Sequence, residues 1–156
     1  MKRLTLIAAT AAASAIAASG LAESHEKMPA EIAARHGQMQ LMSLHLGVVG
    51  NMARGNIDYD AAQAQMAADN LVAVSQISQD LLWPEGTANS DSQFSRALPA
   101  IWESRADFDA KWDAFGTATL ELQAVAGDGL DPMKGGLGAV GRTCGGCHDD
   151  YRVADD

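Results

Sequence analysis

Apolar residues recur at alternating spacings of three and four along four stretches of the chain, a pattern typical of helices that bury one face in a bundle. The pattern predicts helices over residues 29–52, 58–82, 104–126 and 131–151, and strand-like alternation is absent from the sequence. The predicted inward-facing positions are Ile32, Arg35, Met39, Met42, Leu46, Val49 and Ala53 in the first helix, Ala67, Leu71, Val74, Ile77 and Leu81 in the second, Phe108, Trp112, Phe115, Thr119 and Leu122 in the third, and Met133, Leu137, Val140, Cys144, Cys147 and Tyr151 in the fourth.

Residues that cap or break helices support these boundaries. Asp58 or Asp60 can serve as the N-cap of the second helix, and Asp131 as N-cap with Pro132 at the first helical position begins the fourth. Residues 84–99 are rich in Pro, Gly, Ser, Asn and Asp, and we expect them to form the one long connection. The other two connections are short, so the helices that they join are expected to be antiparallel neighbours. The predicted fold is therefore an all-α, antiparallel four-helix bundle.

The N-terminus has the residue order of a secretory signal peptide. Lys2 and Arg3 precede an apolar run over residues 4–18, and small residues follow as far as Ala22. The run is shorter than the roughly 20 residues that cross a membrane. We therefore expect residues 1–22 to be removed on export, residues 23–156 to form the single mature domain, and the mature protein to have no membrane association.

The chain is acidic, with 11 Lys and Arg against 20 Asp and Glu and a formal net charge of −9. Loss of the signal peptide would leave nine basic residues against the 20 acidic ones, a net charge of −11. Binding to nucleic acid requires clustered Lys and Arg, so we expect no nucleic-acid partner. An acidic protein instead favours partner proteins with a basic docking surface, in association that weakens with salt.

The most specific motif is C-x-x-C-H, at Cys144-Gly145-Gly146-Cys147-His148. It is the attachment signature of c-type haem, in which each thiol adds to a vinyl group of the porphyrin and the histidine binds the iron as proximal ligand. On a helix the two cysteines and the histidine lie at i, i+3 and i+4 and share one face. The motif predicts one covalently attached haem c, with its iron, near the C-terminus.

Three other interpretations of the motif fit less well. A redox-active disulfide belongs at a strand-to-helix junction, and no strand is predicted before the motif. A structural zinc site needs four ligands, whereas His25, His36 and His45 lie far upstream. A non-haem helical module with a buried thiol pair would not require His148. We do not expect an enzyme, because nothing in the sequence resembles a nucleophile with its base, a metal-binding carboxylate cluster or a phosphate loop.

The signal peptide, the four predicted helices and the C-x-x-C-H motif close to the C-terminus resemble the class II c-type cytochromes, which comprise cytochrome c′ and its low-spin relatives. Segments 143–152 and 83–87 and the pair Arg35 and Met39 match patterns of that family, and the resemblance spans residues 29–153. It implies a periplasmic haem protein and a homodimer formed through the first two helices. One departure is Gly145-Gly146, where many members have a lysine.

A haem gives Arg35 a reason to interrupt an apolar stripe. A guanidinium inside a bundle is costly unless it is paired, and the haem propionates supply carboxylates for it. The alternative is that Arg35 extends to solvent from the end of the bundle. His36 could reach a propionate or be exposed. By resemblance, Thr87 and Asp91 lie near the propionates, although both are also ordinary turn residues.

Met39 decides between two functions, because by resemblance it occupies the distal position opposite His148, with Met42 as the neighbouring alternative. If the Met39 thioether binds the iron, the haem is six-coordinate and low-spin, and the protein transfers single electrons to and from redox proteins. If Met39 only packs there, the haem is five-coordinate and admits nitric oxide or carbon monoxide, as in cytochrome c′. Because His and Met are a standard pair of haem ligands, we favour the electron carrier and keep gas binding as the alternative.

Overall fold

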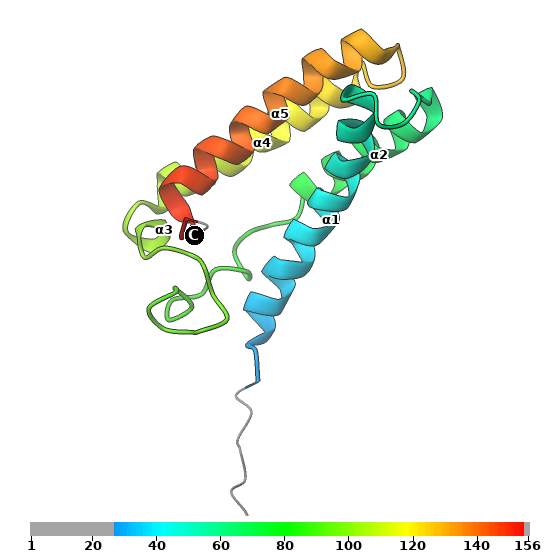
Figure 1. The fold of residues 1–156 in the computed structure, drawn as a ribbon. Helices are drawn as coiled ribbons and strands as arrows, with labels where there is room; N and C mark the ends of the chain where they lie inside the picture. The colour runs from blue at the N-terminus through cyan, green and yellow to red at the C-terminus, as the bar shows by residue number, and fades with distance from the viewer. Residues whose placement is uncertain (1–26, 155–156) are drawn as a thin grey trace, which may run out of the picture.

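A computed structural model describes residues 27–154, which form a four-helix bundle with one additional short helix (Figure 1). The helices are α1 (Ala30–Ala53), α2 (Ala61–Ser75), α3 (Ala100–Glu103), α4 (Arg105–Gln123) and α5 (Leu130–Tyr151). α4 packs chiefly against α5, and α2 packs against both α1 and α4. The predicted all-α bundle is confirmed. The predicted signal peptide, residues 1–22, lies outside the described residues.

The predicted boundaries agree with the structure for α1, and for α4 to within three residues, whereas α3 was not predicted. The structure also settles which aspartate caps α2. The Asp60 carboxylate accepts a hydrogen bond from the amide of Gln63 at 2.9 Å, so Asp60 rather than Asp58 is the N-cap. This bond satisfies one of the amides that have no partner within the first turn of a helix.

α2 ends at Ser75, and its predicted extension to residue 82 is wrong. The indole of Trp112 on α4 donates a hydrogen bond to the Ser75 carbonyl at 3.0 Å, so this carbonyl already has a partner from another helix. Serine near a helix end also favours local bonds that compete with the helix. The predicted inward positions Ile77 and Leu81 are wrong for the same reason, because they follow the helix end and are 45% and 85% exposed.

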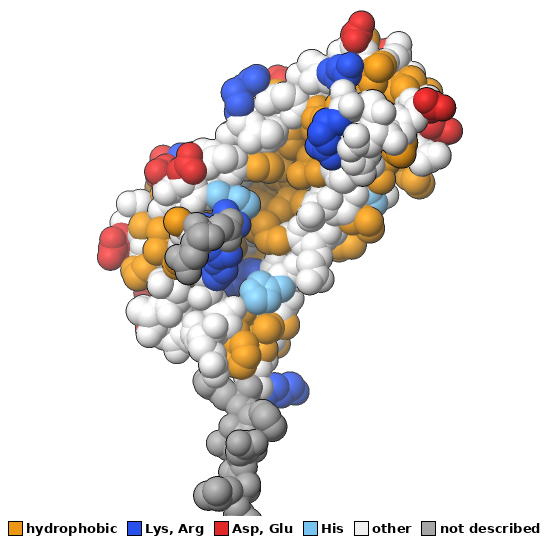
Figure 2. All heavy atoms as spheres, in the orientation of Figure 1, with side chains coloured by type: hydrophobic (Ala, Val, Ile, Leu, Met, Phe, Trp, Pro, Cys, Tyr) orange, Lys and Arg blue, Asp and Glu red, His pale blue; other side chains and the backbone are white. Residues whose placement is uncertain are grey.

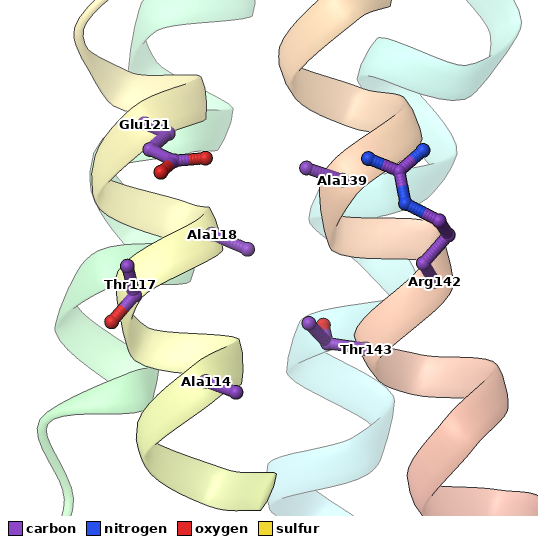
Figure 3. A pocket seen from close by; sticks show the side chains of 7 residues that line it. All are labelled: Ala114, Thr117, Ala118, Glu121, Ala139, Arg142 and Thr143. Carbon is purple, nitrogen blue, oxygen red and sulfur yellow. The ribbon is translucent and has the colours of Figure 1, made fainter.

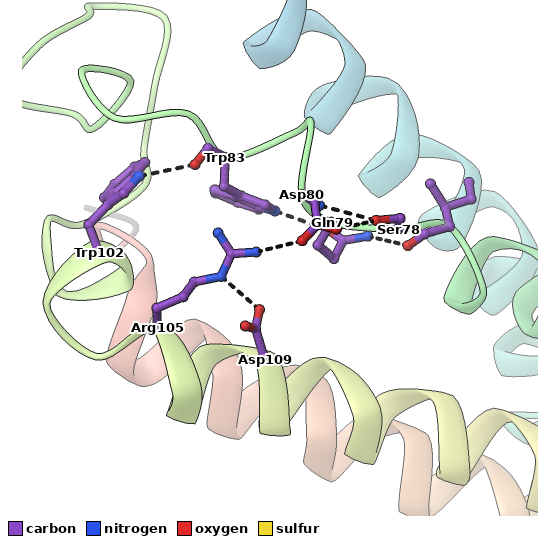
Figure 4. Close-up of polar contacts among 8 residues, drawn as sticks. Ser78, Gln79, Asp80, Trp83, Trp102, Arg105 and Asp109 are labelled. Carbon is purple, nitrogen blue, oxygen red and sulfur yellow. Dashed lines mark hydrogen bonds and ion pairs between the residues drawn. The ribbon is translucent and has the colours of Figure 1, made fainter.

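The segment that follows α2 is tied to α4 and to the long connection by polar contacts (Figure 4). The guanidinium of Arg105 on α4 lies 3.6 Å from the carboxylate of Asp80. The indole of Trp83 donates to the side-chain carbonyl of Gln79 at 3.0 Å, and the indole of Trp102 donates to the Trp83 backbone carbonyl at 3.1 Å. These bonds fix Trp83 at the start of the connection.

α5 begins earlier than predicted, and its N-cap is Gly129 rather than Asp131. Gly129 has φ +138°, a conformation that glycine adopts without strain. The hydroxyl of Tyr59 accepts a hydrogen bond from the Gly129 amide at 3.0 Å and so holds this turn in place. Pro132 is the third helical residue rather than the first, and it still lies in the first turn, where no intrahelical amide bond is lost.

The core consists of two clusters of buried side chains. The larger one lies between α1, α2, α4 and α5, and it includes the fully buried Leu71 and Leu122. The smaller one joins the long connection to α4 and to the C-terminal end of α5. In it the ring of Phe108 packs edge to face against Trp83 and Tyr151, with centroids 4.9 and 5.4 Å apart. The functional site lies where these two clusters adjoin.

Candidate functional site

A cavity of about 530 Å³ opens between α1, α4, α5 and the long connection. Figure 2 shows a hollow with hydrophobic side chains on its floor in this part of the molecule. Its wall includes Cys144, Cys147 and His148 from α5, and Met39 and Met42 from α1. The structure therefore brings the C-x-x-C-H motif together with both candidate distal methionines.

The wall from α5 carries two free thiols, and both cysteines are half-buried. Burial raises the pKa of the Cys144 thiol and of the Cys147 thiol, and the positive charge of Lys111 partly opposes the effect at Cys147. Both are therefore held in the protonated form, which exchanges with disulfides slowly. His148 directly follows Cys147 and is also half-buried in this wall.

The wall from α1 presents two methionines that differ in burial. Met42 is only 8% exposed and is a member of the larger core cluster. Met39 is half-buried and packs against the outside of that cluster. Because the protein itself covers less of Met39, this side chain is the more available of the two to a group in the cavity.

Arg35 is buried in the cavity wall, with 4% exposure, so the alternative in which it extends to solvent is wrong. Its Nη2 donates to the Thr87 carbonyl at 3.3 Å, and Nε and Nη1 are buried without a hydrogen-bond partner. The guanidinium also lies over the ring of Trp83. Burial lowers the pKa of Arg35, and the carboxylate of Glu31 partly opposes this. A buried guanidinium of this kind attracts an anion.

The three other residues expected near the propionates have different positions. His36 lines the cavity and is exposed at its edge. Thr87 contacts Arg35 through its backbone carbonyl, while its hydroxyl donates to the Pro84 carbonyl at 2.7 Å. The Asp91 carboxylate accepts a hydrogen bond from the Ala88 amide at 3.1 Å and so caps a turn. Neither Thr87 nor Asp91 lines the cavity.

Sequence reasoning missed three positively charged residues of the cavity wall, namely Arg96, Lys111 and Arg152. Among the described residues, no Asp or Glu lines the cavity. Arg96 also donates to the Val153 carbonyl at 2.7 Å, beside the backbone bridge between Ala97 and Arg152. Isolated basic residues on separate elements form no pattern in the sequence, so only the fold could reveal this cluster. The cavity wall is therefore positively charged, although the chain as a whole is acidic.

A second hollow, of about 480 Å³, follows the seam between α4 and α5 (Figure 3). Its lining includes the small side chains Ala114, Ala118 and Ala139, with Glu121 on α4 and Arg142 on α5. No thiol, thioether or imidazole lines it. The chemistry of the C-x-x-C-H motif therefore belongs to the first cavity.

The residues of the first cavity fit a haem c. Its volume falls within the range of about 300–1,000 Å³ that is typical of cofactor sites. It combines an apolar wall, two free thiols, an imidazole and a guanidinium with unpartnered nitrogens. Within residues 27–154, no three His, Cys, Asp or Glu side chains are grouped closely enough to hold a metal ion directly.

Comparison with known proteins agrees with this fit. The model of the Cytochrome C' family matches residues 30–152. The chain is 39% identical over 142 residues to cytochrome c-554 of Cereibacter sphaeroides, which covers 91% of this chain and 93% of that protein. Its fold is similar to that of cytochrome c' from Rhodobacter Spheriodes, with a TM-score of 0.78 and 37% identity over 80% of this chain and 96% of the other.

A third similar protein is a mutant of cytochrome c prime from Alcaligenes xylosoxidans, whose structure is a nitric oxide complex. It has a TM-score of 0.69 and 30% identity over 80% of this chain and 94% of the other. Cytochromes of this family are haem proteins rather than enzymes, and they carry one covalent haem c on a C-x-x-C-H motif. With its four-helix bundle and with one such motif near its C-terminus, the chain belongs to the cytochrome c′ family.

Proposed function

We propose that the protein is a periplasmic electron carrier in which His148 and Met39 bind the haem iron from opposite sides. The observation that carries the proposal is that His148 of α5 and Met39 of α1 line the same largely apolar cavity. When bound, the haem supplies a one-electron ferric–ferrous couple, and His–Met ligation raises its reduction potential.

Cys144 and Cys147 hold the haem through two thioether bonds. Each thiol would add across one vinyl group, its sulfur on one carbon and its proton on the other, a change without net oxidation or reduction. Both anchors and the proximal imidazole of His148 then belong to one helix. The end of that helix is fixed, because the Leu98 amide of the connection donates to the Tyr151 carbonyl at 3.0 Å.

Arg35 holds a haem propionate through its unpartnered nitrogens, Nε and Nη1. Its Nη2 is already bound to the Thr87 carbonyl, which orients the guanidinium. His36 provides a second polar group at the edge of the cavity. Thr87 and Asp91 hold turns of the connection in place through their side-chain hydrogen bonds and do not contact the cofactor directly.

The family and the N-terminal sequence both support a periplasmic site of action. Cytochromes c′ are periplasmic, and we propose that residues 1–22 are the signal that exports this chain. None of the helices in residues 27–154 combines the length and the apolar character needed to cross a membrane. A mature chain with a net charge of −11 favours a redox partner with a basic docking surface.

Gas binding by a five-coordinate haem is the second candidate function. It is favoured by the nitric oxide complex of the similar Alcaligenes protein. In that case Met39 would pack without binding iron, and the apolar side chains of Met42, Leu46 and Phe115 in the same cavity would suit a small neutral gas such as nitric oxide or carbon monoxide.

Two matched variants test the ligand assignment in the holoprotein. Met39→Ala is expected to convert a low-spin ferric absorption spectrum into a high-spin one, because the iron loses its sixth ligand. Met42→Ala is the control, because it removes a buried side chain of the same type, and it is expected to keep the low-spin spectrum. The reverse result would assign the iron to Met42, and a wild type that is already high-spin would favour gas binding.

We also propose a homodimer formed through α1 and α2. Leu41 and Leu44 on α1 and Met66 on α2 are 48%, 62% and 54% exposed, so these helices carry apolar surface that a second copy would cover. Leu44→Glu is expected to produce a monomer in sedimentation analysis. Leu120→Glu on α4, where the leucine is 51% exposed, is the control and is expected to leave the dimer intact.

A further inference from the structure

Lys111 on α4 is the centre of a small charged network that crosses to α5. Its Nζ lies 2.9 Å from Oδ2 of Asp150 on α5 and 4.0 Å from Oδ2 of Asp107 on its own helix. The hydroxyl of Tyr151 donates to the same Asp107 oxygen at 2.7 Å. The lysine is therefore held in one place by groups on both helices.

The two kinds of charge in this network differ in their position relative to the cavity. Lys111 lines the cavity together with Cys147 and His148, and its side chain is 28% exposed. Asp107 and Asp150 do not line it, and their side chains are 61% and 58% exposed. Water screens the exposed carboxylates more strongly than the ammonium, so Lys111 is the charge of the network that acts most directly on the cavity.

Lys111 lies in the same cavity wall as the attachment motif. Cys147 is the residue directly before the proximal His148. A charge fixed in this wall acts on a cofactor anchored at Cys147.

Building on the electron-carrier function proposed above, we propose that the positive charge of Lys111 raises the reduction potential of the bound haem. Reduction brings one electron from a partner protein to the iron and lowers the charge of the cofactor by one. A fixed cation at the cavity wall stabilises the reduced form more than the oxidised form. Lys111 itself gains and loses no proton in this step.

The test is the midpoint potential of the purified holoprotein at low ionic strength. Lys111→Met removes the charge and keeps most of the side-chain length, so the potential is expected to fall, with roughly a threefold lower ratio of reduced to oxidised haem at a fixed applied potential. Lys111→Gln is a second neutral variant. Lys111→Arg keeps the charge and is expected to keep the potential near the wild-type value, which a purely structural role would not require.

Lys134→Met is the matched control, because Lys134 is exposed on α5 and does not line the cavity. The shift caused by Lys111→Met is expected to shrink as salt is added, whereas Lys134→Met shifts the potential little at any salt concentration. If Lys111→Met and Lys111→Gln both keep a reversible couple at the wild-type potential, the proposed role of Lys111 is overturned and the electron-carrier function is not affected. A wild type without a reversible one-electron couple would overturn the electron-carrier function and this role together.

Discussion

The guanidinium of Arg35 lies over the indole ring of Trp83, with Cζ 4.4 Å from the ring centroid. Arg35 belongs to α1, whereas Trp83 belongs to the segment that leaves α2, so the contact ties that segment to α1 at the cavity. The cation–π attraction fixes the guanidinium without neutralising it. The protein thus holds a buried positive charge in position before any anion is bound.

The effect of replacing Arg35 should depend on the haem. In protein prepared without haem, Arg35→Met is expected to leave stability unchanged or to raise it by about 1–4 kcal/mol, because an unpaired buried charge is removed. In the holoprotein the same change is expected to lower stability by about 1–3 kcal/mol, because a propionate loses its partner. Urea unfolding of both forms measures the two effects. Equal destabilisation in both forms would show that Arg35 has no anionic partner.

Two glycines of α5 should respond oppositely to alanine. A Cβ at Gly136 would lie 2.9 Å from Cα of Leu122, so Gly136→Ala is expected to force α4 and α5 apart and to cost about 1–3 kcal/mol. Gly141 is exposed, and a Cβ there meets nothing within 4 Å, so Gly141→Ala is expected to stabilise the helix by up to about 1 kcal/mol. Thermal unfolding measures both changes, and a tolerated Gly136→Ala would contradict the close packing of the two helices.

The N-cap of α2 gives a further stability test. Asp60→Ala removes the bond to the Gln63 amide and is expected to cost about 1 kcal/mol. Asp58→Ala is the control, because Asp58 is exposed and lies outside the helix, and it is expected to change the urea midpoint little. Equal effects of the two substitutions would contradict the cap.

Tyr151 should titrate at unusually high pH. Burial, followed by its hydrogen bond to Asp107 and the charge of that carboxylate, raises its pKa from 10 to about 12. The folded protein therefore binds this proton more tightly than the unfolded chain, so the resulting stability is complete below pH 10 and is lost as the pH rises towards 12.

A variant with a single tyrosine isolates this titration. Because the chain has only two tyrosines, Tyr59→Phe leaves Tyr151 as the one source of tyrosinate absorbance. The expected midpoint is near 12, and circular dichroism checks that the variant remains folded over the titration. A midpoint near 10 would show that Tyr151 is neither buried nor bonded to Asp107 in solution.

Local patterns in the sequence predicted the helices well where one helix face is buried along its length. They failed after Ser75, because a side chain from another helix, Trp112, takes the last carbonyl of α2. They also misplaced the start of α5, because the positive φ of Gly129 and its bond to Tyr59 depend on contacts distant in sequence.

Part of the functional site was predictable from the sequence, and part was not. The motif at 144–148 and the interrupted stripe at Arg35 identified two walls of the cavity. Lys111, Arg96 and Trp83 were not assigned to it, because each comes from a different element and only the packing of those elements brings them together. The roles expected for Thr87 and Asp91 rested on resemblance, and the structure places both outside the cavity wall.

The spin state of the iron in the purified, oxidised wild-type holoprotein tests the central claim most directly. Electron paramagnetic resonance reports whether the ferric iron is low-spin, as two strong axial ligands from the protein make it, or high-spin. Ligation by both His148 and Met39 predicts a six-coordinate, low-spin signal. A high-spin signal would contradict the electron-carrier assignment and would favour a five-coordinate, gas-binding cytochrome.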